Sequence, residues 1–164
     1  MAAPYVFDTK HDRYPLAVHV FLVQEIDRGH ELADERVLLM RRAGSGYADG
    51  QLGLPAGHVD LGETPTACAV RELGEELGIE VRAVDLIPGT TWFRMSQEPR
   101  VDIFYTARSW TGTPEIREPH KCTELVWADP HALPADALEF LAPAWNDAQY
   151  GRVLREYGFA PASA

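Results

Sequence analysis

The order of apolar and polar positions along the chain predicts an alternation of strands and loops with two helices. Apolar runs rich in β-branched and aromatic residues, bounded by turn-forming residues, are typical of buried strands. Polar or glycine-rich loops are expected over Glu25–Glu35 and Ala43–Gly53. The predicted strands are Leu16–Gln24, Arg36–Arg42, Leu54–Val59, Ile79–Leu86, Thr91–Met95, Val101–Ala107 and Glu124–Ala128.

Two segments have the apolar spacing of helices. The first should begin at Thr64, which can cap the N-terminus, with Pro65 in the first helical position and Gly78 at the end. The second covers Leu133–Asp147, and Pro143 should break it. Because strands outnumber helices and do not alternate with them one for one, the pattern favours an α+β fold with helices packed on a mixed sheet.

Length and composition place the chain among ordinary globular proteins. Its 164 residues are 46% hydrophobic and 24% charged, which favours one domain over residues 1–164, with a core of about residues 14–148. The formal net charge of −10 would repel a nucleic acid polymer. A small anionic substrate stays compatible with this charge, because metal ions can bridge an acidic protein and an acidic ligand.

Cysteine use and apolar runs bear on location. Cys68 and Cys122 have a spacing that suits neither a metal knuckle nor a disulfide framework, so we expect a reduced, cytoplasmic protein. The longest apolar run, Ala17–Val23, is too short to span a bilayer. The first residues lack the basic-then-apolar order of a signal peptide. We therefore expect no membrane partner.

One segment, Gly57–Ile79, is unusually acidic: it holds Asp60, Glu63, Glu72, Glu75 and Glu76. The last three have i, i+3 and i+4 spacing, so they share one face of the first predicted helix. Such like charges destabilise a helix by ~0.2–0.5 kcal/mol per pair. An acidic helix face is usually just solvated, but a cluster this dense suggests a hard cation with oxygen ligands, Mg²⁺ or Mn²⁺.

The same segment follows the pattern G-x5-E-x7-R-E-U-x-E-E-x-G-U, where U is a bulky aliphatic residue. Every specified position is filled, from Gly57 through Glu63 and Arg71 to Gly78 and Ile79. The chain therefore resembles the Nudix (MutT-like) hydrolases. This resemblance implies the Nudix fold, with a mixed β-sheet sandwiched between helices. It also implies an enzyme that uses Mg²⁺ or Mn²⁺ to cleave a diphosphate linked to another moiety.

The resemblance assigns roles to the motif residues. Glu72, Glu75 and Glu76 would be the main metal ligands, and Glu63 would lie behind them. Arg71 would hold these carboxylates through charge-assisted hydrogen bonds. Either Glu72, Glu75 or a carboxylate from another loop would act as the general base, and the sequence leaves this choice open.

Candidates outside the helix follow from the same resemblance. The backbone carbonyl of Ala56 would complete the metal coordination, and Glu118, with Glu124 as a weaker choice, would reach the metal from a later loop. Arg41 or Arg42, at a strand tip facing the glycine-rich loop, would bind phosphate. Gly57 and His58 are further substrate contacts, although His58 has an equally good interpretation as a solvent-facing residue. Three aromatic residues can stack a base or pack in the core: Tyr47, Phe93 and Trp127.

The substrate class follows by elimination among subfamilies of this fold. Enzymes that cleave ADP-ribose commonly carry a proline about fifteen residues after the motif, where Arg94 stands here. Hydrolases of dinucleoside polyphosphates tend to carry a tyrosine where this chain has Met95, Ser96 and Gln97. The upstream signature of coenzyme A pyrophosphatases is not apparent. What remains is a nucleoside triphosphate, with an oxidised purine nucleotide as one option, cleaved to monophosphate and pyrophosphate.

Alternatives remain beside this interpretation. The chain can act on another nucleoside diphosphate-linked compound, or it can be a non-catalytic ligand-binding module of the same fold. An isoprenoid diphosphate isomerase fits poorly, because Cys68 and Cys122 do not match the arrangement that reaction needs. A homodimer is a further expectation from the resemblance, with Phe140–Phe159 supplying the contact.

Overall fold

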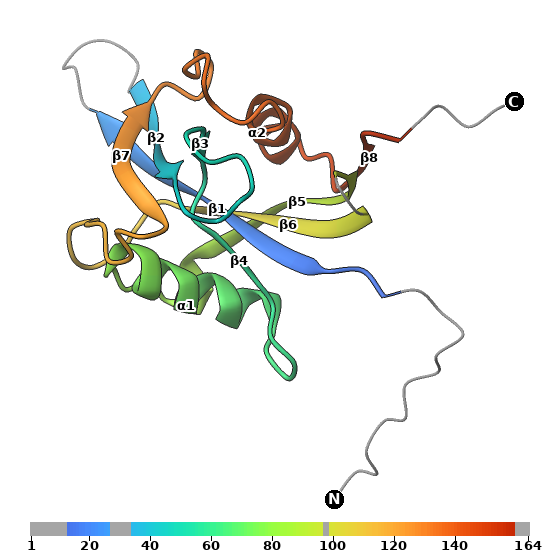
Figure 1. Cartoon of the computed structure of the whole chain (residues 1–164), viewed down its shortest axis with the longest axis horizontal. Coiled ribbons are helices and arrows are strands. Elements are labelled where there is room, and N and C mark those ends of the chain that lie inside the picture. The colour runs from blue at the N-terminus through green and yellow to red at the C-terminus, as the bar shows by residue number, and fades with distance from the viewer. Residues whose placement is uncertain (1–12, 27–33, 97–98, 160–164) are drawn as a thin grey trace, which may run out of the picture.

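The computed structural model describes residues 13–26, 34–96 and 99–159 (Figure 1). Among the described residues, strands outnumber helices and do not alternate with them one for one. In chain order the elements are β1 (Leu16–Ile26), β2 (Asp34–Arg42), β3 (Leu52–Gly53), β4 (Ala56–His58), α1 (Pro65–Leu77), the 3₁₀ turn η1 (Ala83–Asp85), β5 (Leu86–Met95), β6 (Pro99–Ala107), β7 (Cys122–Ala128), α2 (Leu141–Gln149) and β8 (Leu154–Tyr157).

The strands form one mixed sheet. Its main order is β3-β2-β1-β6-β5-β8, while β4 also pairs with β1 and β7 with β2. β1 pairs with β6 in parallel, as β5 does with β8, and the remaining pairs are antiparallel. β1 therefore lies at the centre, next to three other strands.

The alternation of side chains along β1 divides the core between the two faces of the sheet. Val18, Val20 and Leu22 join one cluster with α1, while Phe21 and Val23 join a second cluster with α2. The two helices accordingly lie on opposite sides of the sheet in Figure 1. The predicted fold, a mixed sheet sandwiched between helices, is confirmed.

The predicted ends of α1 are also confirmed. The Thr64 hydroxyl accepts the Ala67 N–H at 3.2 Å, and Pro65 occupies the first turn. Gly78 ends the helix with φ = 67°, a left-handed conformation that suits glycine, and its N–H donates to the Gly74 carbonyl at 3.0 Å. These caps fix which residues of the helix face the sheet and which face solvent.

The strand predicted over Ile79–Leu86 is wrong. Only Glu80 makes a strand-like bridge there, with Thr111, and η1 follows before β5 begins at Leu86. Ile79 and Val81 are buried beside α1 while their neighbours face solvent, so the segment has strand-like alternation with almost no partner to pair with. The strand predicted over Thr91–Met95 begins earlier than expected, with an irregularity between Pro88 and Thr90.

The helix predicted over Leu133–Asp147 is also wrong in its extent. It is α2, which begins only at Leu141, and Pro143 lies in its first turn, where a missing N–H costs no helical hydrogen bond. The preceding residues run beside β3 instead: Leu52 N–H donates to the Asp136 carbonyl and Leu138 N–H to the Leu52 carbonyl, both at 2.9 Å. Leu138 thereby reaches the core as part of a loop.

The remaining predicted strands are present with shifted limits. Of the predicted strand Leu54–Val59, only β4 (Ala56–His58) forms, after Pro55, and β3 takes the end of the predicted glycine-rich loop. β1 runs on to Ile26 and β2 begins at Asp34, so the strands take both ends of the first predicted loop. Residues 27–33 of that loop lie outside the described residues. β8 was not predicted.

A buried carboxylate ties β8 to the rest of the fold. Asp147 in α2 accepts hydrogen bonds from Trp92 Nε1 at 3.1 Å and from Arg155 Nη2 at 2.7 Å, and Arg152 Nε lies 3.2 Å away. Three elements, α2, β5 and β8, therefore share one anchor, to which the segment before β8 adds Arg152.

Two expectations about surroundings remain open. Phe140 and Trp145, which belong to the predicted dimer contact, are buried in the chain's own core, while Tyr150 and Leu154 are exposed. The homodimer therefore stays a prediction. Among the described residues, neither helix combines the length and the apolarity that crossing a membrane requires.

Candidate active site

Two adjoining hollows meet at β4 and the end of β2. The first, about 330 Å³, lies against α1, and we call it the carboxylate hollow. The second, about 360 Å³, lies over β1, β5 and β6, and we call it the arginine hollow. Residues found only in the first are Asp60, Arg71, Glu72, Glu76 and Lys121. Residues lining both are Arg42, Ser45, Ala56, Gly57 and His58.

Arg71 is the centre of the carboxylate hollow. Its Nε and Nη2 donate to the two oxygens of Glu63 at 2.9 and 3.0 Å, and its Nη1 donates to Glu72 at 2.7 Å and Glu75 at 3.0 Å. Nη2 also donates to the His58 carbonyl at 3.2 Å. One guanidinium thus faces three glutamates, which leaves an excess of negative charge around it.

Gly57 sets the position of Glu72. A Cβ atom at Gly57 would collide with the Glu72 carboxylate. This is a requirement for space, because the glutamate lies directly against the glycine backbone. The first glycine of the motif therefore lets a helix carboxylate reach the wall of the carboxylate hollow.

Burial changes the pKa values of the helix glutamates. Burial raises the pKa of Glu76 to about 8, against the one stabilising hydrogen bond that it accepts from the Ala56 N–H at 3.0 Å. Burial likewise raises the pKa of Glu72, although Arg71 opposes this. The hydrogen bond from Arg71 lowers the pKa of Glu63 to about 2. For Glu72 the effect of burial outweighs the hydrogen bond from Arg71, whereas for Glu63 the hydrogen bond from Arg71 outweighs burial.

The other predicted metal ligands lie differently. Glu75 is the most exposed of the three helix glutamates, with 55% of its side chain accessible against 13% for Glu72. Both oxygens of Glu118 face Lys121 Nζ, at 2.8 and 2.9 Å. Within residues 13–26, 34–96 and 99–159, the structure forms no ready-made metal cluster of three His, Cys, Asp or Glu side chains.

The two neighbouring arginines of β2 separate. Arg42 lines both hollows and donates to the Tyr47 carbonyl at 3.0 Å. Arg41 lines neither; it donates to Glu124 at 2.6 Å, to Asp136 at 2.7 Å and to the Gly50 carbonyl at 2.8 Å. Arg41 therefore ties together the loops beside the arginine hollow, and Glu124 is committed to it.

At the arginine hollow the charges are arranged the other way round, with one carboxylate facing two arginines and a histidine. Asp102, fully buried, accepts hydrogen bonds from Arg94 Nε and from Arg100 Nε, the latter at 3.0 Å, and lies 3.2 Å from His19 Nε2. Burial alone would raise the pKa of Asp102, but its bonds with His19 and Arg94 hold it below the usual range. Burial lowers the pKa of His19. Neutral His19 therefore carries its proton on Nε2, since the ionised carboxylate can only accept.

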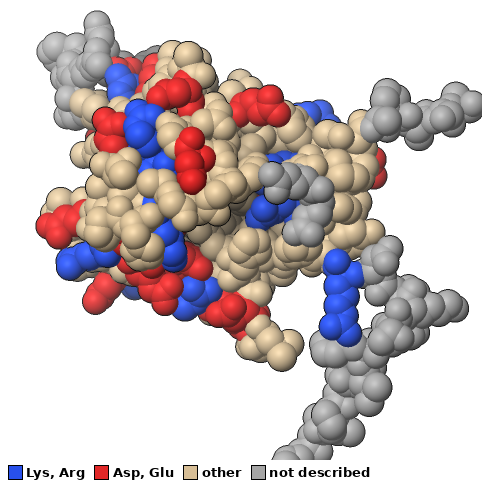
Figure 2. Space-filling model, in the orientation of Figure 1, with Lys and Arg blue, Asp and Glu red and all other residues tan. Residues whose placement is uncertain are grey.

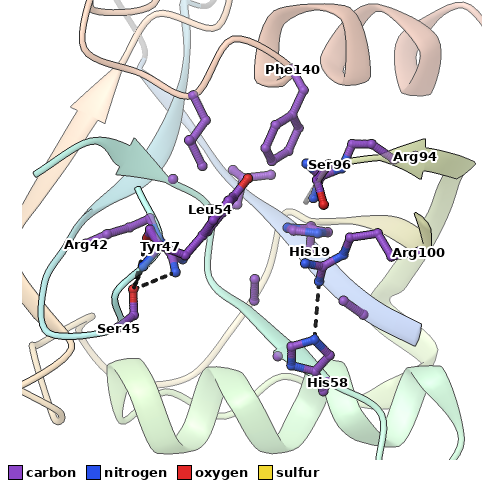
Figure 3. Close-up of a pocket in the computed structure, with 15 residues that line it drawn as sticks. His19, Arg42, Ser45, Tyr47, Leu54, His58, Arg94, Ser96, Arg100 and Phe140 are labelled. Atoms are coloured by element: carbon purple, nitrogen blue, oxygen red, sulfur yellow. Dashed lines mark hydrogen bonds between the residues drawn. The ribbon is translucent and has the colours of Figure 1, made fainter. Parts of the chain in front are cut away.

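Figure 3 shows how these side chains are arranged. Arg42, Ser45 and Tyr47 lie on one side of the hollow and His19, Arg94 and Arg100 on the other. His58 reaches toward Arg100, its Nε2 at 3.4 Å from Arg100 Nη2. Figure 2 shows acidic and basic side chains gathered together along the α1 side of the same face of the molecule.

Of the three aromatic residues considered for base stacking, only Tyr47 lines the hollow. Phe93 stacks on Phe159 with ring centroids 5.1 Å apart, and Trp127 packs against Trp110 at 6.2 Å beside the α1 core. The two are structural residues in this arrangement.

The family can now be stated. A model of the NUDIX domain family matches residues 13–149. The chain belongs to the Nudix family. It is 35% identical over 121 residues to an 8-oxo-dGTP diphosphatase of Haemophilus influenzae, covering 73% of this chain and 81% of that protein. An Escherichia coli protein of the same name is 39% identical over 46 residues, which are 28% of this chain and 36% of the relative. The prediction of a Nudix hydrolase, an enzyme acting on phosphoric anhydride bonds, is confirmed.

Solved structures agree on the fold. A MutT NUDIX hydrolase from Burkholderia pseudomallei superposes with a TM-score of 0.69 at 24% identity, over 83% of this Nudix chain and 98% of that one. The NUDIX domain of Shewanella oneidensis NrtR, solved with ADP ribose, gives a TM-score of 0.61 at 21% identity, over 89% and 93%. These likenesses show the fold alone, so the substrate must be argued from the site.

Several residues of this Nudix chain's site were not predicted from its sequence. His19, Arg94 and Arg100 line the arginine hollow, Asp102 is buried behind them, and Lys121 lines the carboxylate hollow. A signal existed for two of them, because His19 and Asp102 interrupt otherwise apolar strands. A charged residue inside such a strand needs a buried partner. The sequence does not show which partner it has.

Proposed function

We propose that the chain is a metal-dependent pyrophosphohydrolase that cleaves a nucleoside triphosphate to the monophosphate and pyrophosphate. The observation that carries this proposal is the junction of the two hollows. A carboxylate-lined site for a metal-bound diphosphate opens directly into a second hollow of a size suited to an organic group. An oxidised purine nucleotide is one such substrate, as the name of the Haemophilus relative suggests.

The residues present fit a divalent cation. Nudix hydrolases generally need a divalent metal. Glu72 and Glu76 are partly buried carboxylates without enough positive charge beside them, and oxygen donors are what Mg²⁺ and Mn²⁺ prefer. Glu72, Glu75, Glu76 and the Ala56 carbonyl would hold the ion. Bound there, it would neutralise the phosphates and lower the pKa of the attacking water.

The remaining residues of the site have proposed roles around that reaction. Arg71, held by Glu63, positions Glu72 and Glu75. Arg42 and His58, at the junction of the hollows, contact the substrate phosphates together with the Gly57 backbone. The general base is Glu72, Glu75 or a loop carboxylate such as Glu118, which is paired with Lys121 of the carboxylate hollow.

Pyrophosphate release from a panel of nucleotides, with Mg²⁺, with Mn²⁺ or with a chelator, tests the proposal. We expect turnover of at least one triphosphate only with a metal, and a loss of about 100-fold or more in Glu72→Gln and Glu75→Gln. Glu115→Gln removes an exposed glutamate outside both hollows and serves as the control. Equal activity of Glu75→Gln and the wild type would contradict the catalytic assignment.

A second candidate substrate is a nucleoside diphosphate linked to another group. The likeness to the Shewanella domain solved with ADP ribose favours including it. The same panel should therefore contain ADP-ribose and nucleoside diphosphate sugars, with release of a monophosphate as the readout.

A further inference from the structure

The arginine hollow offers hydrogen-bond donors. Its described lining includes Arg42, Arg94, Arg100, His19 and His58, and none of its described lining residues is an Asp or Glu. This is unusual in a chain whose formal net charge is −10. The basic lining is therefore a property of this hollow and does not follow from the composition of the chain.

Asp102 fixes the orientation of two of these donors. Arg94 on β5 and Arg100 on β6 each use Nε to bind it, which sets the plane of each guanidinium group. Arg94 lies over the Phe140 ring, 4.3 Å from its centroid, and is 4% exposed. Such side chains have lost their freedom before a ligand arrives, which reduces the entropic cost of binding.

Partial neutralisation also decides what kind of group fits. Arg94 and Arg100 share one buried, ionised carboxylate, so together they supply donors with less net charge than two separate arginines. A neutral acceptor oxygen suits this pair better than a second phosphate. Guanidinium groups are well matched to the oxygen at C6 of a purine. The amino group at that position in adenine would place donor against donor.

We infer that the arginine hollow binds a purine that carries oxygen at C6, read by Arg94 and Arg100, with Asp102 as the residue that positions them. The aromatic ring of Tyr47 in the same lining provides apolar surface for the base. This inference rests on the proposed function, because it takes the diphosphate to lie in the carboxylate hollow. It extends that function to the choice of base.

Inosine and adenosine monophosphates test the inference without turnover. They lack the anhydride bond, and they differ at C6 by oxygen against an amino group. We expect the wild-type protein to bind the inosine nucleotide about tenfold or more tightly than the adenosine nucleotide, measured by calorimetry. Guanosine and 8-oxoguanosine monophosphates should follow inosine. Equal affinities for inosine and adenosine monophosphates would overturn the inference.

A third ligand tests the alternative that the arginine hollow binds a second anionic group and not a base. Adenosine 3′,5′-bisphosphate keeps the amino group and adds a phosphate. If it binds more tightly than inosine monophosphate, the hollow is a site for a second anion and the inference is wrong. If it binds no better than adenosine monophosphate, base recognition is supported.

Variants locate the preference. Arg100→Gln should reduce the ratio of the two affinities toward one, while the affinity for pyrophosphate, which probes the carboxylate hollow, stays unchanged. Arg82→Gln removes an exposed arginine outside both hollows and should keep the full preference. Since Arg100→Gln leaves Arg94 and His19 beside Asp102, we expect it to fold; Arg100→Lys provides a second, milder variant. An unchanged ratio in both folded variants would contradict the assignment.

The outcomes for base choice and for catalysis are distinct. Hydrolysis of all triphosphates at equal rates, with no inosine preference in binding, would remove this inference and leave the proposed function standing. A clear inosine preference in binding without any hydrolysis would support the base preference and contradict the proposed catalytic function.

Discussion

The two charge centres of this protein are built in opposite senses. In the carboxylate hollow one arginine, Arg71, faces Glu63, Glu72 and Glu75 at the protein surface. Behind the arginine hollow one buried carboxylate, Asp102, faces two arginines and a histidine. The first centre therefore has negative charge to spare, and the second has donors to spare.

This difference explains how one molecule can hold the two ends of a nucleotide. A surplus of carboxylates suits a cation that bridges to phosphate, and a surplus of donors suits the acceptor edge of a base. The protein's overall acidity does not prevent it from binding an anionic ligand, because charge is distributed locally. Each centre can be disturbed separately, which makes the comparison testable.

The largest expected effect is on stability and comes from Asp102→Asn. The change leaves Arg94 buried beside a neutral group, so we expect a loss of about 3 kcal/mol in the free energy of unfolding at pH 7. The pKa of Asp102 is lower in the folded protein than its usual value of about 3.9. Its stabilising contribution is thus complete above that value and is lost as the pH falls below about 4.

Urea unfolding of both proteins at pH 7 and pH 3 measures this contribution. The difference between wild type and variant should be large at pH 7 and smaller at pH 3. A difference that is the same at both pH values would show that the charge of Asp102 contributes nothing.

The next effect is on activity and comes from Gly57→Ala. The added Cβ must displace the Glu72 carboxylate, and a displacement of this kind near reacting groups costs about 100-fold in rate. The thermal unfolding midpoint should change little by comparison. Steady-state hydrolysis of the best triphosphate, beside a thermal scan, is the measurement. Full activity would mean that Glu72 need not lie against Gly57.

A smaller effect is expected from Arg71→Gln. Its removal leaves Glu63, Glu72 and Glu75 without their shared cation, so the unfolding midpoint should fall in the presence of a chelator. Adding Mn²⁺ should then raise the midpoint of the variant more than that of the wild type, because the ion replaces missing positive charge. An equal rise of the unfolding midpoint in the two proteins would contradict an excess of negative charge in the carboxylate hollow.

The smallest effect is expected from Gly74→Ala. Gly74 lies inside α1, and an added Cβ would meet only the Ile79 carbonyl at an ordinary 3.8 Å. Replacing glycine by alanine inside a helix stabilises by about 0.5–1 kcal/mol. Activity should stay at the wild-type level, so the variant separates the stability of the helix from the geometry of its carboxylates. Chemical unfolding and the hydrolysis assay together check both parts.

The two centres also differ in how far the sequence reveals them. The carboxylate hollow draws mainly on the short segment Gly57–Ile79, where helix spacing places the glutamates on one face. The caps Thr64 and Gly78 mark the ends of that helix, and both were predicted. Local spacing was enough because the geometry of a helix is regular.

The arginine hollow could not be assembled in this way. His19 and Asp102 are 83 residues apart, and they meet because β1 and β6 pair in parallel. Strand pairing across such a distance depends on the whole topology. The strand wrongly predicted from Ile79 and the helix wrongly predicted from Leu133 have the same origin. The pattern of apolar residues is local. Whether a segment becomes strand, helix or loop depends on the distant segment with which it pairs.

The anchor at Asp147 bears on where the chain can be cut. The family match ends at residue 149, yet the cations that face this buried carboxylate, Arg152 and Arg155, come after that point. A version of the protein ending with the family match would keep the carboxylate and lose both of its arginines, together with the edge strand that covers Trp92. The fold therefore needs residues beyond the region by which its family is recognised, because a buried carboxylate depends on the arginines that follow it.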